Sequence, residues 1–306
     1  MTTLTQVPTV GDLSTLIAPF ERSLRAQRKS PRTVDCYGQA ARQLVAFLQA
    51  SGMPTIAANV TREHIEMFIE SLIERFKPAT ANNRYRALQA WWKWLSEEGE
   101  VTSNPMARMK PPKVPEETVP VIPDDQITKL LRTTEADKSF EGRRDTALIR
   151  LLLDSGMRAS ELVGLRLDDL GLDEGVVWVR GKGDRPRGAP FGSRAAVAID
   201  RYLRLRAPHA HSTSPYLWLG PRGRLTDSGL RQVLERRCAL AGIPYINPHR
   251  FRHTFAHRWS DEGGSESDLM RLLGWRSRQM VLRYAASTGE ERARRSYKRA
   301  GFGDRY

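Results

Sequence analysis

Apolar residues recur at helical spacing through most of the first hundred positions. Between residues 13 and 50 they return every three or four positions. The clearest examples are Tyr37, Ala41, Leu44, Val45 and Leu48. Ser30-Pro31 interrupts the run with a helix-start signal, because serine caps free backbone N–H groups and proline fits the first helical turn. The pattern therefore predicts two helices within residues 13–50.

Two more helices are expected before residue 104. One begins at Thr61 and carries its apolar side at His64, Ile65, Phe68, Ile69 and Ile73. The other begins near Thr80 and carries Leu88, Trp91, Trp92 and Leu95. Their spacing favours a packed core over a base-stacking role for the tryptophans.

The periodicity then stops in a segment rich in proline. It contains Lys110 and Lys113 together with Pro111, Pro112, Pro115, Pro120 and Pro123. Such a segment is typical of a semi-rigid linker. We place the boundary near Lys113, which gives a helical domain at residues 1–113 and a second domain at residues 114–306.

The second domain is expected to be mainly helical with one small antiparallel β-sheet. Strand signals at residues 176–179 and 185–191 flank Gly181-Lys182-Gly183-Asp184, a tight-turn signal that predicts a hairpin with Lys182 at or beside its tip. Helical spacing covers the segments 124–132, 143–154, 194–205, 226–241, 251–261, 265–273 and 277–284.

The charge balance points to a polyanionic partner. Among 306 residues, 49 lysines and arginines oppose 35 acidic residues, and the formal net charge is +14. Because phosphate neutralisation gives affinity without sequence specificity, nucleic acid is the first partner to consider. Basic residues outnumber acidic ones on both sides of the linker, as expected if both domains bind one duplex.

Composition also indicates a compartment. Cys36 and Cys238 are the only cysteines, so a disulfide framework is not expected and a reducing cytoplasm is the default. No run of about 18 apolar residues predicts a membrane span. The N-terminus does not combine a basic region with an apolar stretch, which argues against secretion.

Candidate chemistry gathers towards the C-terminus. His249 and Arg252 lie one helical turn apart, so a proton-transfer group would sit beside a guanidinium that fits phosphate oxygens. The Tyr284 phenol is a candidate nucleophile. Arg158 follows Gly156, a helix-stop signal, near the start of the next helix, although a lone arginine there is usually only a surface residue.

A metal site was the alternative for this segment. His249, His253 and His257 recur at every fourth position, but Arg250 and Arg252 lie among them. That concentration of positive charge disfavours a divalent ion. We therefore expect no metal and no cofactor.

These motifs together resemble the tyrosine recombinase family, also called the phage integrase family. They are Arg158 with Glu161 three positions later, Lys182 between glycines in a hairpin, His249-x-x-Arg252, and Leu-Gly-Trp275 with Tyr284 nine positions on. The resemblance extends from Ser30-Pro31 to Tyr284. It implies a two-domain C-shaped clamp around double-stranded DNA, with a helical, SAM-like core-binding domain before a catalytic domain. The N-terminus is too short for a further arm-type domain, which favours a simple, Xer-like recombinase.

The resemblance also implies a reaction. DNA strands would be cut and rejoined through a 3′-phosphotyrosine on Tyr284. Arg158 and Arg252 would hold the phosphate oxygens, and His249 would handle the tyrosine proton. Lys182 is expected to protonate the departing 5′-hydroxyl, and Glu161 to orient Arg158.

One position departs from the usual family pattern. Trp275 occupies a site where many members carry histidine. An indole N–H can donate a hydrogen bond to a phosphate oxygen, but it cannot carry a proton. We therefore expect Trp275 to act by packing and hydrogen bonding, which leaves His249 as the only imidazole of the set.

DNA contacts outside the site are predicted less sharply. Residues 82–86 are polar, basic and aromatic at the start of a helix, which fits either a solvated face or a helix end on DNA phosphates. The expected DNA-binding residues are Arg84, Arg86, Lys110, Lys113 and Arg185. The basic segment 292–299 fits DNA or, as favoured here, a neighbouring protomer in a synaptic tetramer on DNA.

Three functions stay open at this stage. The favoured one is a site-specific recombinase or integrase; the others are a type IB-like topoisomerase and a catalytically silent DNA-binding relative. Phage or mobile-element integration, transposition, inversion and dimer resolution share the recombinase chemistry, so the residues do not choose among them.

Overall fold

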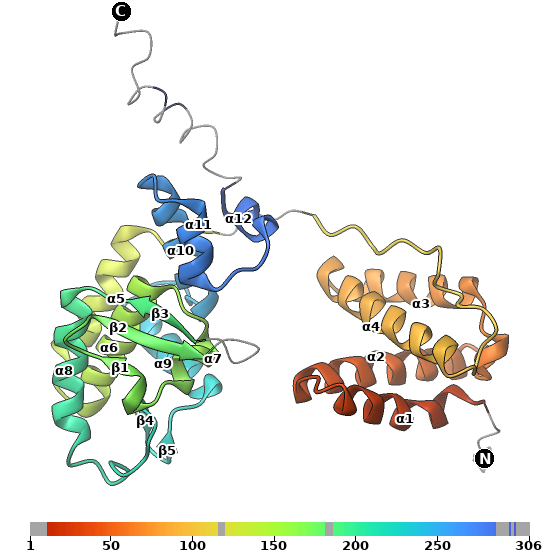
Figure 1. The fold of residues 1–306 in the computed structure, drawn as a ribbon, viewed down its shortest axis with the longest axis horizontal. Helices are drawn as coiled ribbons and strands as arrows, with labels where there is room; N and C mark the ends of the chain where they lie inside the picture. The colour runs from red at the N-terminus through yellow and green to blue at the C-terminus, as the bar shows by residue number, and fades with distance from the viewer. Residues whose placement is uncertain (1–10, 116–119, 181–185, 286–293, 295–296, 298–306) are drawn as a thin grey trace, which may run out of the picture. The chain divides into compact units, whose positions relative to one another are not determined.

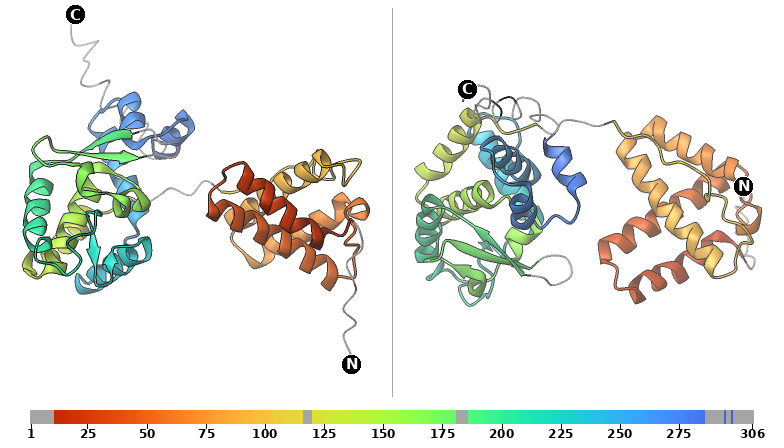
Figure 2. Two further views of the ribbon diagram at one scale, coloured as in Figure 1. Left: turned by 60° about the horizontal axis from the view of Figure 1, so that its bottom comes forward. Right: turned by 45° about the horizontal axis from the view of Figure 1, so that its top comes forward.

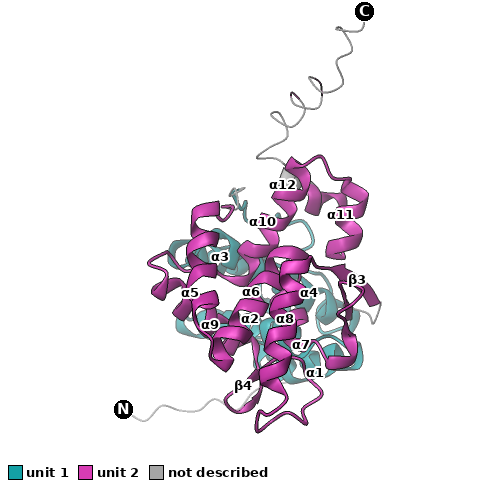
Figure 3. Cartoon of the chain, turned by 90° about the vertical axis from the view of Figure 1, so that its left-hand side faces the viewer, with its two compact units in different colours: residues 1–116 teal, residues 117–306 magenta. Residues whose placement is uncertain are grey.

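The chain divides into two compact units, Met1–Glu116 and Glu117–Tyr306 (Figures 1 and 3). They are seen in a computed structural model that describes residues 11–115, 120–180 and 186–285, together with Arg294 and Tyr297. Each unit has its own buried apolar core.

The described part of the first unit is built mainly from helices. Its α-helices are α1 (Leu13–Ala26), α2 (Pro31–Ala50), α3 (Arg62–Arg75) and α4 (Pro78–Glu97). The start predicted for α2 is confirmed: Pro31 is its first residue, and the Ser30 hydroxyl accepts a hydrogen bond from the Thr33 backbone N–H at 3.2 Å. Trp91 and Trp92 are fully buried, which confirms that α4 carries core residues.

The second unit is mixed. Its α-helices are α5 (Asp124–Ala136), α6 (Phe140–Ser155), α7 (Ala159–Gly164), α8 (Ser193–Arg206), α9 (Asp227–Leu240), α10 (Pro248–Asp261), α11 (Glu266–Leu273) and α12 (Arg278–Ala285). Its strands are β1 (Leu170–Gly171), β2 (Val176–Arg180), β3 (Pro186–Pro190), β4 (Leu219–Gly220) and β5 (Gly223–Arg224). Helices α5, α6 and α8 lie side by side (Figure 3).

The predicted hairpin is present. Strands β2 and β3 pair antiparallel, with Val177 opposite Ala189 and Val179 opposite Arg187, and β1 pairs on the other edge of β2. Both valines and Ala189 are buried, so this face of the hairpin packs on the core. The tip, residues 181–185, lies outside the described residues.

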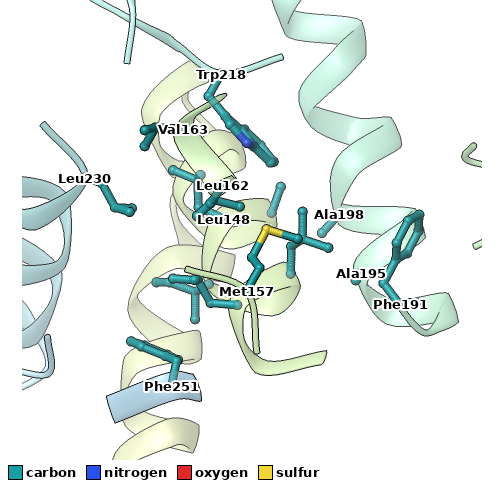
Figure 4. Close-up of a cluster of buried hydrophobic side chains, with 14 of the residues drawn as sticks. Leu148, Met157, Leu162, Val163, Phe191, Ala195, Ala198, Trp218, Leu230 and Phe251 are labelled. Carbon is teal, nitrogen blue, oxygen red and sulfur yellow. The ribbon is translucent and has the colours of Figure 1, made fainter. Parts of the chain in front are cut away.

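The large core of the second unit fixes the chain on which the candidate arginines lie. Met157 is fully buried beside Leu148 and Leu162, and Phe251 enters the same cluster from α10 (Figure 4). Met157 directly precedes Arg158, and Phe251 directly precedes Arg252. Burial of a side chain of this size stabilises the fold by roughly 1.5–3 kcal/mol.

The last three helices enclose a smaller core. Ala256 of α10, Leu269 and Leu273 of α11, Trp275, and Val281 of α12 form it. Helix α11 also packs against β3, and α10 against α6, so the hairpin and the C-terminal helices border one region of the unit (Figures 1 and 2).

A buried carboxylate ties α6 to α9. Asp145 is fully buried and accepts hydrogen bonds from Arg144, Arg236 and Arg237. Arg237 also donates to Asp137 at 2.8 Å. A carboxylate with several charged donors avoids the large penalty of a lone buried charge.

Among the described residues, none of the helices combines the length and the apolar character that crossing a bilayer requires.

Candidate active site

Arg158 is positioned from both its backbone and its side chain. Helix α6 ends at Gly156, whose left-handed backbone (φ 56°) turns the chain, and buried Met157 anchors the next position. Arg158 then caps α7: its backbone N–H donates to Glu161 Oε2 at 2.8 Å and its Nη1 to Glu161 Oε1 at 2.7 Å. The Arg158 side chain is 44% exposed, so its other N–H groups can meet a ligand.

Arg252 is fixed far more tightly. It follows buried Phe251 on α10 and is itself only 1% exposed. Its Nη1 donates to the Gly156 carbonyl at 3.0 Å and its Nη2 to the Leu273 carbonyl at 2.5 Å. The guanidinium therefore joins the end of α6 to the end of α11.

Trp275 packs beside Arg252. The Arg252 Cζ lies 5.4 Å from the centre of the Trp275 ring, within the range of a cation–π contact. Gly274 ends α11 in the left-handed conformation (φ 63°), and the backbone N–H of Trp275 donates to the Met270 carbonyl at 2.9 Å. The indole is 7% exposed, so it is held in the small core.

His249 and Tyr284 lie on helices that pack together. His249 is the second residue of α10, exposed, and its ring meets the His253 ring edge-on with 4.4 Å between centres. Tyr284 lies in the last turn of α12, which packs against α10 and α11. The neighbouring His253 is only 5% exposed.

Arg187 is part of the site and was not among the residues that the sequence singled out. From β3, its Nη2 donates to Glu161 Oε2 at 2.9 Å and its Nε to the Leu272 carbonyl at 3.0 Å. Its side chain is 13% exposed. Burial lowers the pKa of Arg187, which Glu161 opposes, and the group stays charged. Its place five residues after Lys182 on a strand was the only signal available.

These contacts close a ring through segments that are distant in sequence. The ring passes through Arg158, Glu161, Arg187, the carbonyls of Leu272 and Leu273, Arg252 and the carbonyl of Gly156. The two arginines predicted to hold one phosphate thus belong to one hydrogen-bonded network.

Comparison with known proteins decides the family. The sequence pattern of the phage integrase family matches residues 120–291, and that of the phage integrase N-terminal SAM-like domain matches residues 16–99. The tyrosine recombinase XerC of Oceanobacillus iheyensis is 30% identical over 88% of this chain and 90% of its own length. The chain belongs to the phage integrase family.

Solved structures of related fold agree with this assignment. A XerH site-specific recombinase bound to its palindromic difH substrate superposes with a TM-score of 0.72 at 16% identity, over 95% of this chain and 85% of XerH. A lambda integrase tetramer bound to a Holliday junction superposes with a TM-score of 0.69 at 16% identity, over 90% of this chain and 83% of lambda integrase. These similarities place the chain in the tyrosine recombinase fold.

The remaining predicted residues divide into three groups. Lys182 and Arg185 lie outside the described residues. Arg84 is engaged within the first unit, since its Nη2 donates to Gln39 Oε1 at 2.8 Å and its Nη1 to the Cys36 carbonyl at 3.5 Å. Arg86, Lys110 and Lys113 are exposed, as a phosphate-binding surface requires.

Within the described segments, no group of three or more histidine, cysteine, aspartate or glutamate side chains is arranged to hold a metal ion. His209 and His211 contact each other outside the site, with 5.7 Å between ring centres. Of the segment 292–299, only Arg294 and Tyr297 are described, and both are exposed.

Proposed function

We propose that this chain is a site-specific DNA recombinase that cuts and rejoins strands through a phosphotyrosine at Tyr284. The observation that carries the proposal is the network that joins Arg158 to Arg252 in a domain of the tyrosine recombinase family. Tyr284 follows Trp275 on the next helix, close in sequence to one side of that network.

Each step has a residue to perform it. The Tyr284 oxygen attacks the scissile phosphorus, the new P–O bond forms on the 3′ side, and the bond to the 5′-oxygen breaks. His249 takes the phenol proton, which is needed because a free phenol has a pKa of about 10. Lys182 supplies a proton to the departing 5′-oxygen, and the reverse sequence rejoins the strand.

Arg158 and Arg252 stabilise the charge that gathers on the non-bridging oxygens. Arg252 is held by two carbonyls, so its charge is already oriented before DNA arrives. Arg158 is more exposed and supplies a second guanidinium from the start of α7. Two arginines and a lysine thereby supply the positive charge, and the phosphotyrosine keeps the energy of the broken bond for rejoining.

The partners follow from this chemistry. Strand exchange between two duplexes uses four active sites, so we expect a tetramer on DNA, as in the lambda integrase assembly on a Holliday junction. Both units would bind double-stranded DNA, in the cytoplasm where the chromosome lies. The basic segment 292–299 would dock on a neighbouring protomer; removal of residues after Ser287 should abolish synapsis while duplex binding persists.

The decisive test begins with the target site. Covalent protein–DNA adducts are trapped in cells, the attached DNA is sequenced, and a nicked duplex containing the mapped site is then offered to the purified protein. We expect a covalent product that Tyr284→Phe does not form, and strand exchange between two site-bearing duplexes. Relaxation of supercoiled DNA without site preference would indicate a topoisomerase instead, and absence of any adduct would indicate a silent relative.

A further inference from the structure

Arg187 is a largely buried charged residue for which the proposed reaction has no role so far. It lies on β3 and is not among the residues assigned to the phosphate, the nucleophile or the proton steps. Its side chain is 13% exposed, and removing a charged guanidinium from water is costly unless its N–H groups donate hydrogen bonds within the protein.

Its contacts join three separate segments. Through Glu161 it reaches the start of α7, where Arg158 lies. Through the Leu272 carbonyl it reaches the end of α11, two residues before Gly274 and three before Trp275. Through its own backbone it belongs to the β2–β3 hairpin, in which Lys182 lies between the two strands in sequence.

Glu161 is shared between two guanidinium groups. Oε1 accepts from the Arg158 guanidinium, and Oε2 accepts from the Arg187 guanidinium and the Arg158 backbone N–H. The Glu161 side chain is 7% exposed. A carboxylate confined in this way cannot rotate without breaking a charged hydrogen bond. Arg187 also offsets part of the negative charge that Glu161 places beside Arg158.

The local backbone is shaped to admit this side chain. A Cβ on Gly274 would lie 3.2 Å from the Arg187 Nε and 3.3 Å from its Cδ, closer than ordinary contact. The Nη1 atom of Arg187 is buried, and no described residue accepts a hydrogen bond from it. The contacts of the fork among the described residues are therefore carried by Nε and Nη2.

We infer that Arg187 is a positioning residue for strand cleavage. Its contacts hold the Arg158–Glu161 pair in a fixed position relative to the end of α11 and Trp275. They also connect both segments to the β2–β3 hairpin, to which Lys182 belongs in sequence. This inference rests on the proposed recombinase function. A lysine would keep the charge at this place but not the fork, since one ammonium cannot reproduce two N–H groups held at fixed angles.

The test uses the full-length protein and a nicked duplex containing the mapped site, on which cleaved DNA cannot be rejoined. Single-turnover cleavage rates and duplex dissociation constants are measured for wild type, Arg187→Lys, Glu161→Gln and the double variant. Arg237→Lys is the matched control, because Arg237 is likewise mostly buried, at 5% exposed, and forms ion pairs outside the network, with Asp137 and Asp145. Thermal unfolding and titration with DNA give the folded, binding-competent fraction of each protein.

We expect Arg187→Lys to slow cleavage by about tenfold to 100-fold, as small displacements of catalytic groups do, with duplex affinity nearly unchanged. Because Arg187 acts largely through Glu161, most of this loss should disappear when it is introduced into Glu161→Gln. Arg237→Lys should lower the melting temperature and leave the rate per folded molecule at the wild-type value.

Three results would overturn the inference: wild-type cleavage by Arg187→Lys, an equal loss in both backgrounds, or a loss matched by Arg237→Lys at equal folded fraction. A variant too unstable to assay is replaced by Arg187→Gln in the same scheme, with the same expectations. Failure of the proposed function is distinct, since then wild-type protein itself would not cleave the duplex.

Discussion

At the scale of single residues, the candidate site depends on guanidinium groups held by backbone carbonyls and one carboxylate. Arg252 donates to the carbonyls of Gly156 and Leu273, and Arg158 is held by Glu161. Such groups need little reorganisation when charge develops on a phosphate, which is the main source of electrostatic catalysis.

Trp275 offers a test of this rigidity. Trp275→Ala removes the ring beside the Arg252 guanidinium and opens the small core, so cleavage of the nicked duplex should fall by about tenfold or more. Trp275→Phe keeps an aromatic face but no N–H donor and should lose less. Rates measured on both variants separate packing from hydrogen bonding, and wild-type cleavage by Trp275→Ala would rule out a role for the indole.

Residue spacing could identify much of this site, but not all of it. Arg158, His249, Arg252 and Trp275 were predicted because each occurs in a short motif with a mechanical reason. Arg187 was not, because it contacts Glu161 and Leu272, which lie 26 and 85 positions away in sequence. Arg84, a basic residue at a helix start, stays a predicted DNA contact, and the structure adds that its guanidinium donates to Gln39 of α2.

At the scale of elements, the ends of helices set the geometry. Helices α6 and α11 both stop at a glycine with left-handed backbone, Gly156 and Gly274, and the carbonyls near these stops accept from Arg252. Helical spacing located the helices well, because each buries one apolar stripe. It gave no indication of which helix ends meet.

Gly274→Ala should destabilise the protein by more than the strained backbone conformation alone would cost. The left-handed conformation costs a non-glycine residue about 1 kcal/mol, and here the new methyl also meets Arg187. Gly242→Ala is the control, since Gly242 has φ 64° and no atom within 4 Å of an added Cβ. Chemical denaturation should show a greater loss for Gly274→Ala, and only that variant should also cleave slowly. Equal losses of stability in the two variants would show that the Arg187 side chain moves aside with little loss of free energy.

The α5–α6 junction has a predictable acid response. Hydrogen bonds from Ser139 and Arg237 lower the pKa of Asp137 from 3.8 to about 2. A depressed folded-state pKa stabilises the protein above the unfolded value, and this contribution is lost as the pH falls from about 4 through 2. With one third of the side chain exposed, we discount it to roughly 1–2 kcal/mol.

Asp137→Asn should therefore lower the free energy of unfolding at pH 7 by that amount and flatten its dependence on pH between about 4 and 2. Urea denaturation at a series of pH values measures both quantities. Asp173→Asn, at an exposed position, should change neither. An unchanged pH slope in Asp137→Asn would show that other carboxylates control the acid response.

At the scale of the whole molecule, two units with separate cores are joined by a proline-rich segment. The change from helical periodicity to clustered prolines was enough to predict a boundary there. Net charge of +14 and family membership support the proposed partner, double-stranded DNA, whereas the sequence that would be recognised depends on contacts with base edges. The coupling between distant segments arises only once the second unit is folded.

The identity of the covalently attached residue tests the central proposal most directly. Wild-type protein is reacted with a nicked duplex containing the mapped site, digested with protease and nuclease, and analysed by mass spectrometry. We predict a peptide that carries a nucleotide joined through its 3′-phosphate to Tyr284. Attachment at any other residue, or an adduct that persists in Tyr284→Phe, would contradict the proposed mechanism.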